Sequence, residues 1–270
     1  LIAHATIEES TSLAKQFPQF SVVVTTGGAG EPMRIPNKVV GTQTQLIQVG
    51  TKGMFAGVLG LFGESDSATR YQRVPLDGRF RDGPEMLQLL AEYQRQLEDE
   101  GMDGLGINEQ IHPTGRKFVG SETCADCHDV EYDIWNDGQN GHPPKHSMAF
   151  ASLKSPPARK AIPRHHDPEC ISCHVVGWNP QKYFPYESGF RNEKETPELT
   201  GVGCENCHGP GSDHVAAELG DVKLTDDAID SLREQMRLSL EDAEVTCLGC
   251  HDLDNSPHFV EDDNFELYWE

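Results

Sequence analysis

The sequence predicts an α/β segment in residues 1–105, a linker in residues 106–117, and a mostly α-helical and irregular segment in residues 118–270. Three observations predict this division. Valine-, isoleucine- and leucine-rich runs alternate with helical patterns in the first segment. The linker is rich in glycine, proline and polar residues. From Phe118 onward strand patterns are no longer apparent, and short helical patterns alternate with Pro- and Gly-rich loops.

The elements of the first segment follow from hydrophobic spacing and from the residues at their ends. The expected bounds are residues 1–4 for a strand end, 7–17 for an amphipathic helix, 21–25, 45–49 and 56–62 for buried strands, and 84–100 for a long helix. The long helix is the most distinct of these elements. Pro84 suits its first turn, and Gly101 suits its end. Because these strands need neighbours, we expect this segment to be the tail of a larger domain.

In the last segment, helical patterns cover residues 122–135, 147–153 and 226–240. The segment has few aliphatic residues for its length. Side chains alone are therefore not expected to fill its interior, and a bound apolar group is expected to supply the rest.

Charge excludes several classes of function. The 270 residues include 22 Lys and Arg and 44 Asp and Glu, a net charge of −22, and residues 106–270 hold 31 of the acidic residues against 13 basic ones. Such a surface repels phosphate backbones, so nucleic-acid binding is not expected. No run approaches the roughly 18 apolar residues of a membrane span. The acidic face either keeps the protein soluble or docks a basic partner.

All eight cysteines fall into four copies of the pattern Cys-x-x-Cys-His, here called the first to fourth attachment motifs. This pattern is the attachment site of c-type haem. Its two thiols can add to the two vinyl groups of one porphyrin, and its histidine then lies over the iron as an axial ligand. The sequence therefore predicts four haem c groups per chain. The motifs are Cys124, Cys127 and His128; Cys170, Cys173 and His174; Cys204, Cys207 and His208; and Cys247, Cys250 and His251.

Paired cysteines have other uses, namely four-cysteine zinc sites, disulfides and redox dithiols. None of these requires a histidine directly after the second cysteine, whereas all four motifs have one. Haem attachment takes place outside the cytoplasmic membrane, so the protein is expected to be exported to the periplasm or the cell exterior. The apolar start Leu1-Ile2-Ala3 lacks a basic region and a cleavage site, so we expect it to be trimmed.

Each iron can take a second axial ligand, and the chain has eight further histidines. Methionine is a less favoured ligand here, because multihaem chains with spare histidines usually use two histidines. Apart from His4, which lies in the α/β segment, the candidates are His112, His142, His146, His165, His166, His214 and His258.

The first segment resembles the C-terminal part of calcineurin-like metallophosphatases of the 5′-nucleotidase type. The resemblance is carried by LIAHATIEESTSLAKQFPQFSVVVTTGGAGEPMRIP and GTQTQLIQVGTKGMFAGVLGLF. In that family one strand ends in a metal-binding histidine, matched by His4, and a later strand ends in Gly-His-x-His. Here the latter reads Gly27-Gly28-Ala29-Gly30, so glycines occupy both ligand positions. The resemblance implies a degenerate segment without phosphatase activity, in which His4 is a leftover polar residue.

The second segment resembles the tetrahaem cytochrome c-554 family from Phe118 to about Phe259. The matching motifs are FVGSETCADCH, KHSMAFASL, DPECISCHVVGW and GVGCENCHGPGSDH. The resemblance implies a mostly helical and irregular chain around stacked haems, with electron transfer as its function and with His146 and His214 as distal ligands. In a subgroup of such proteins a degenerate metallophosphatase domain precedes the cytochrome domain.

The sequence thus predicts an electron carrier with redox-protein partners rather than an enzyme. Three alternatives stay open. One is a multihaem oxidoreductase that acts on a small nitrogen or sulfur compound at an open haem. Another is a subunit of a polymeric cytochrome wire, a homo-oligomer or filament in which a distal histidine crosses the interface. The third is a phosphoesterase, which the replacements at Gly28 and Gly30 disfavour.

Overall fold

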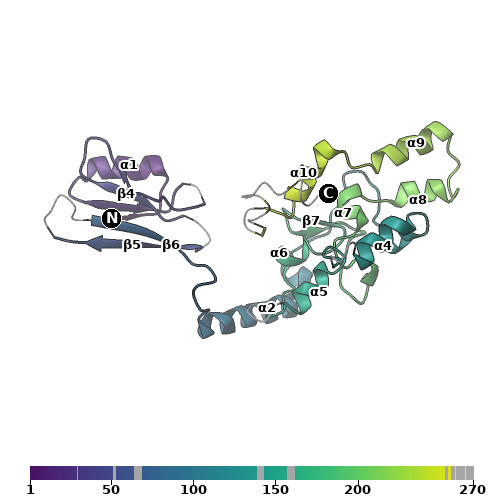
Figure 1. The fold of residues 1–270 in the computed structure, drawn as a ribbon, viewed down its shortest axis with the longest axis horizontal. Helices are drawn as coiled ribbons and strands as arrows, with labels where there is room; N and C mark the ends of the chain where they lie inside the picture. The colour runs from purple at the N-terminus through teal and green to yellow at the C-terminus, as the bar shows by residue number, and fades with distance from the viewer. Residues whose placement is uncertain are drawn as a thin grey trace. The chain divides into compact units, whose positions relative to one another are not determined.

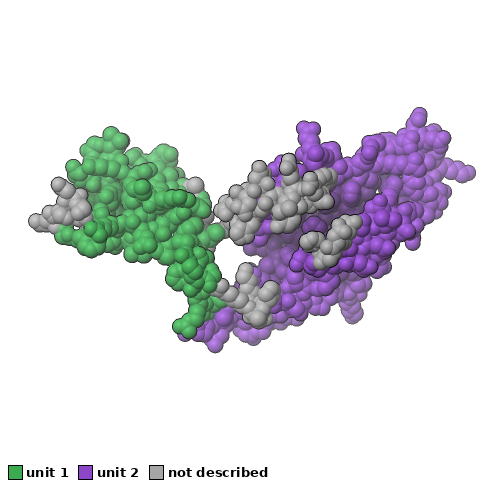
Figure 2. Space-filling view, in the orientation of Figure 1, with its two compact units in different colours: residues 1–83 green, residues 84–270 purple. Residues whose placement is uncertain are grey.

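The computed structural model describes residues 1–28, 30–50, 53–63, 69–138, 143–156, 162–252, 255–256, 259 and 265. The chain divides into two compact units, residues 1–83 and 84–270 (Figures 1 and 2). The long helix that the sequence analysis placed in the first segment is grouped with the second unit.

The first unit is built on a small mixed sheet. β1 (Ile2–Ala3), β2 (Val22–Thr25) and β4 (Gln45–Gln48) are parallel, and β3 (Asn37–Lys38) pairs antiparallel with β4. Helix α1 (Ile7–Gln16) connects β1 to β2. It begins with a capping box, in which Thr6 and Glu9 bond each other's backbone N–H groups. The predicted strands at 21–25 and 45–49 and the predicted helix at 7–17 are therefore confirmed.

A buried seam joins α1 to this sheet. The apolar residues that form it are Ala3, Ala14, Val23, Val39 and Leu46. Ser10 and Thr25 are also fully buried, and the Ser10 hydroxyl donates to Thr25 Oγ1 at 2.7 Å while Thr25 donates to the Ala5 carbonyl at 2.9 Å. These bonds satisfy polar groups that would otherwise be costly to bury.

A hairpin completes the first unit. β5 (Phe55–Leu61) confirms the predicted strand at 56–62 and pairs antiparallel with β6 (Thr69–Pro75). The sequence analysis missed β6 and β3. The reason is compositional, since β6 (TRYQRVP) alternates polar and apolar residues without a hydrophobic run, and β3 has only two residues.

Helix α2 (Pro84–Gly104) starts at the predicted proline. Its backbone leaves the helical conformation at Gly101, where φ is 61°, and then forms one more turn. This confirms Gly101 as the end of the regular helix, since a positive φ favours glycine. Leu97 and Gln94 are buried, and the Gln94 amide donates to Asp167 Oδ2 at 2.8 Å. This bond lies within the second unit.

In the rest of the second unit, the described residues form short helices and one small hairpin (Figure 1). The hairpin strands β7 and β8 correct the expectation that no strands follow Phe118. The elements are α3 (Ser121–Ala125), α4 (Asp129–Asp137), α5 (Ala149–Lys154), α6 (Pro168–Ile171), β7 (Trp178–Asn179), β8 (Phe184–Pro185), the 3₁₀ helix η2 (Pro197–Leu199), α7 (Cys204–His208), α8 (Ser212–Glu218), α9 (Asp226–Gln235) and α10 (Leu240–Leu248).

Three predicted helices have different bounds in the structure. The pattern at 122–135 is two helices, because the backbone at His128 has φ −119° and ψ 51° and ends the helical geometry between α3 and α4. The pattern at 226–240 likewise ends at α9, and Ser239 caps the separate helix α10. α5 begins two residues later than the pattern at 147–153.

The second unit also contains an apolar core of its own side chains. Its buried members are Phe150, Leu153, Ile171, Val175, Val176, Trp178, Phe190 and Leu199, with the Cys170 side chain packed against them. Its members include residues of α5 and α6 and of the loops around β7 and β8. This cluster fills the interior around β7 and β8, and the expectation that a bound apolar group supplies the rest of the interior stays a prediction.

Candidate haem attachment sites

Each attachment motif begins in a short helix, with its first cysteine in α3, α6, α7 or α10. Helical hydrogen bonds run through the motifs. The His128 N–H donates to the Cys124 carbonyl at 2.9 Å, and the His251 N–H donates to the Cys247 carbonyl at 2.8 Å. Residues four apart on a helical turn lie on the same face. In these motifs the first cysteine thiol and the histidine imidazole can therefore bind the same haem.

Thiols of different motifs contact each other. The Cys124 thiol donates to the Cys204 sulfur, which raises the pKa of Cys124 and lowers the pKa of Cys204 to about 6. In the same way the Cys250 thiol donates to Cys173 and lowers the pKa of Cys173. The first motif thus touches the third, and the second touches the fourth.

The third and fourth motifs are also neighbours. Burial raises the pKa of the Cys207 thiol, and the charge of Cys247 adds to this rise. None of the eight cysteines forms a disulfide. All eight sulfur atoms are therefore available for bonds to haem.

Three of the four motif imidazoles are oriented through Nδ1. His174 Nδ1 lies 2.7 Å from the Ala149 carbonyl, His208 Nδ1 lies 2.7 Å from the Met236 carbonyl, and His251 Nδ1 lies 3.0 Å from Ser256 Oγ. A backbone carbonyl accepts only from a protonated Nδ1. In His174 and His208 this bond leaves Nε2 as the free ligand nitrogen, which is the usual outer-shell arrangement of metal-bound histidine.

Two pairs of imidazoles face each other across a gap. The ring centroids of His128 and His214 are 6.5 Å apart, and those of His146 and His251 are 6.2 Å apart. Two imidazole nitrogens at about 2.0 Å from one metal place their ring centroids about 6.3 Å apart. The gaps are too wide for ring contact but match one iron between each pair. The residues present therefore fit a haem at the first and fourth motifs.

The acid–base state of these residues agrees with this use. Burial lowers the pKa of His146, His174 and His251. A lowered pKa favours the neutral imidazole, which is the form that binds a metal. His214 Nδ1 lies 3.8 Å from Glu218 Oε1, so a carboxylate lies close to the Nδ1 side of this imidazole.

Among the other predicted histidines that the structure describes, none has a ring contact with a motif imidazole. His112 packs edge-on against Phe118 and Tyr186, with ring centroids 5.6 and 4.7 Å away. The rings of His165 and His166 are 4.2 Å apart, and both line a cavity of about 650 Å³ beside α2. His142 and His258 lie outside the described residues.

In the first unit, His4 and the glycine motif lie at the carboxyl ends of β1 and β2. His4 is exposed. Gly28 has a φ of 111°, and a side chain there would collide with the side chain of Gln48. In the metallophosphatase pattern this position holds the first histidine of the Gly-His-x-His pair. Here the packing of Gln48 leaves no room for a side chain at Gly28. The resemblance of this segment to metallophosphatases stays a prediction.

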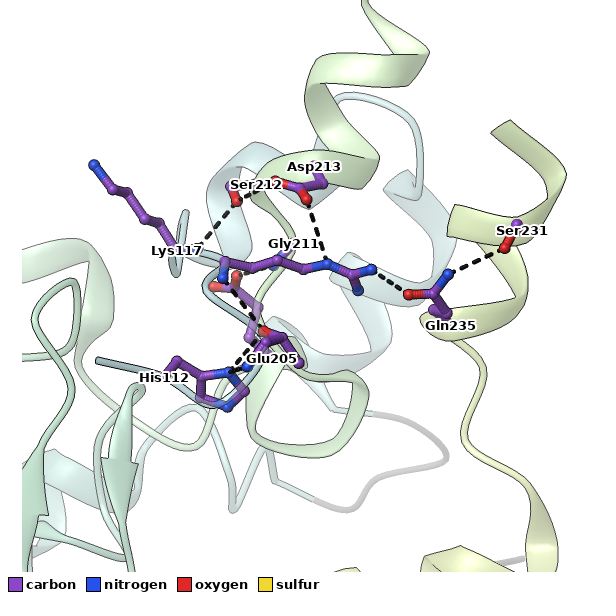
Figure 3. A network of polar contacts seen from close by, with 10 residues as sticks. His112, Lys117, Glu205, Gly211, Ser212, Asp213, Ser231 and Gln235 are labelled. Carbon is purple, nitrogen blue, oxygen red and sulfur yellow. Dashed lines mark hydrogen bonds and ion pairs between the residues drawn. The ribbon is translucent and has the colours of Figure 1, made fainter. Parts of the chain in front are cut away.

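One residue of the site, Glu205, is not predicted by the sequence pattern. It is a variable position within the third motif, yet it is 3% exposed and accepts backbone hydrogen bonds. Figure 3 shows it beneath the start of α8, beside a network that includes Asp213 and Gln235. No signal in the sequence marks it, because the middle residues of this motif can be of any type.

Repeated thiol and imidazole motifs of this geometry define the class of c-type multihaem cytochromes, and comparisons with known proteins support this class. Residues 123–209, which hold the first three motifs, match the model of a family described as cytochrome c554 and c-prime. The chain is 34% identical over 103 residues to cytochrome c-554 of Nitrosomonas europaea, an alignment that covers 35% of this chain and 39% of that protein. It thus spans about two fifths of this relative's length. No solved structure gives a significant match.

The matches support haem c as the cofactor. Among the described residues, no helix is both long enough and apolar enough to cross a bilayer.

Proposed function

We propose that this protein transfers electrons outside the cytoplasm through four covalently bound c-type haems. The observation that carries the proposal is the order in which the attachment motifs lie next to one another. Haems anchored at these thiols would form one series, from the first motif through the third and fourth to the second. A continuous series suits electron transfer in short steps. Cys124 is hydrogen-bonded to Cys204 and Cys250 to Cys173, and α7 and α10, which carry Cys207 and Cys247, pack against each other.

The residues have distinct tasks in this proposal. When bound, haem supplies reversible one-electron exchange at its iron. The eight thiols would hold the porphyrins, and each motif histidine would bind one iron. His214 and His146 would bind the irons of the first and fourth motifs as second ligands, which the ring separations of 6.5 and 6.2 Å support. Two imidazoles form a ligand shell that needs little change between oxidation states, which suits a carrier.

The compartment and the partners follow from the same chemistry. Covalent haem attachment takes place outside the cytoplasmic membrane, so we place the protein in the periplasm or at the cell exterior. Its partners are redox proteins. The 31 acidic residues of residues 106–270 favour partners with a basic docking face, since complementary charge speeds encounter.

Haem quantitation tests the proposal directly. We expect the purified protein to carry four haems that survive denaturing electrophoresis, because each attachment motif has both thiols and its histidine. Haem staining and pyridine haemochrome absorbance measure the count. Variants in which Cys124 and Cys127 are both alanine should carry three. Fewer than four haems in the wild type, or stoichiometric zinc, would contradict the proposal.

We expect residues 1–105 to have no phosphatase activity. Two-metal hydrolysis needs both ions held about 4 Å apart by a full ligand set, and Gly28 and Gly30 supply no ligand side chain. Metal analysis of the whole protein and assays with nucleotide and generic phosphoesters, with and without a chelator, are the measurements. Turnover that the chelator abolishes would disprove this expectation.

A further inference from the structure

Glu205 is a carboxylate buried inside the third attachment motif, with 3% of its surface exposed. Both of its oxygens lie 3.0 Å from the Val119 nitrogen. Oε2 also accepts from the Gly120 N–H at 2.8 Å, and Oε1 accepts from the Gly211 N–H at 2.8 Å. All three partners are donors, so their bonds favour the ionised carboxylate.

These donors belong to two segments that are distant in the sequence. Val119 and Gly120 directly precede α3, which carries Cys124 of the first motif. Gly211 directly precedes α8, which carries His214. Glu205 itself lies in α7 with the third motif. One buried side chain therefore ties together the first motif, the third motif and the imidazole that faces His128.

Further polar contacts join the residues before α3 to the start of α8 and to the end of α9 (Figure 3). Arg116 pairs with Asp213 at 3.5 Å and with the Gln235 side chain, and the Lys117 N–H donates to the Ser212 hydroxyl at 3.0 Å. The Arg116 side chain is 13% exposed but its partner Asp213 is 56% exposed, so water and salt partly screen this pair, unlike the bonds of Glu205. The buried bonds of Glu205 are therefore the stronger constraint on the start of α8.

The charge of Glu205 has a second effect. Burial raises its pKa, and the backbone N–H groups of Gly211, Gly120 and Val119 oppose that rise. Inside the protein a negative charge is weakly screened, so it stabilises nearby positive charge. The oxidised iron carries one more positive charge than the reduced iron. A nearby carboxylate stabilises that charge and so makes the iron harder to reduce.

We propose that Glu205 is a positioning residue that sets the reduction potential of the neighbouring haems. Its carboxylate holds His214 opposite His128, and its negative charge favours the oxidised iron at the first and third motifs. This inference rests on the proposed electron-transfer function.

Three variants of the whole haem-loaded protein test this inference. Glu205→Gln keeps the shape and removes the charge, whereas Glu205→Asp keeps the charge and shortens the reach. Glu198→Gln is the matched control, because Glu198 lies beside Gly120 but is exposed. The readouts are potentiometric titration and the electron paramagnetic resonance of the oxidised haems.

For Glu205→Gln we expect the reduced-to-oxidised ratio of one or two haems at a fixed potential to rise about tenfold, which is 59 mV for a one-electron couple. Glu205→Asp should change the low-spin signal of the first haem and shift its potential less. A purely structural role would not separate the two variants in this way.

Several outcomes would overturn the inference. One is a wild-type potential and a wild-type spectrum in both Glu205 variants. Another is an equal potential shift in Glu198→Gln. If the Glu205→Gln variant does not incorporate its haems, the Glu205→Asp variant alone tests the inference. An unchanged low-spin signal in Glu205→Asp would then refute the positioning role. A wild-type haem count below four would instead refute the proposed function, and this result is obtained before any variant is compared.

Discussion

Replacing His214 or His146 by alanine is expected to convert one haem per chain from low spin to high spin. Each imidazole faces a motif histidine at a separation that matches one shared iron. Without it, that iron loses one axial ligand and becomes five-coordinate or binds water. The haem itself should stay in place, because its two thioether bonds persist. Electron paramagnetic resonance of the oxidised protein should show one new high-spin signal for each variant.

His165→Ala is the matched control for both variants. His165 is a partly buried histidine of the same unit, but its ring packs against His166 and Phe150 rather than facing a motif imidazole. Its replacement should leave all haem spectra unchanged. Wild-type spectra in both the His214 and the His146 variants, or a high-spin signal in the control, would refute the pairing and require ligands from other positions.

The local chemistry of the site could be predicted from the sequence, because it is encoded at fixed spacing. A thiol and an imidazole four residues apart share one face of a helical turn, so the motif alone specifies which groups act together. The pairing of His214 with His128 is different in kind. It depends on the path of the chain between α4 and α8, and only the resemblance to known motifs pointed to His214 and His146.

The fold was predictable where hydrophobic periodicity was continuous, as in α1, β2, β4 and α2. The bounds of elements could not be predicted where contacts between distant segments, rather than the spacing of hydrophobic residues, determine the backbone. The helical pattern across His128 continues in the sequence, but the backbone there turns out of the helix between α3 and α4. Glu205 was missed for a related reason. Its importance comes from three backbone donors in other segments, and such donors leave no side-chain pattern to recognise.

The core of the second unit includes Trp178, which is 4% exposed. Its indole N–H donates to the Phe190 carbonyl at 2.7 Å. The flanking backbones approach closely, since a side chain at Gly189 would meet the carbonyl of Gly177. Trp178 therefore joins the loop around β7 to the loop that ends at Phe190.

Replacing Trp178 by alanine is expected to lower the free energy of unfolding by about 3–5 kcal/mol, because the variant leaves a large cavity and an unpaired buried carbonyl. Trp178→Phe keeps most of the volume and loses the hydrogen bond, so its cost should be clearly smaller. Guanidinium titration followed by haem absorbance measures both values, since ligand loss on unfolding changes the spectrum. Trp178 contributes no ligand, so the haem spectra of the folded alanine variant should match those of the wild type. A loss below about 1 kcal/mol would show that this core carries little of the stability, and that the haems hold the unit together as the sequence alone had led us to expect.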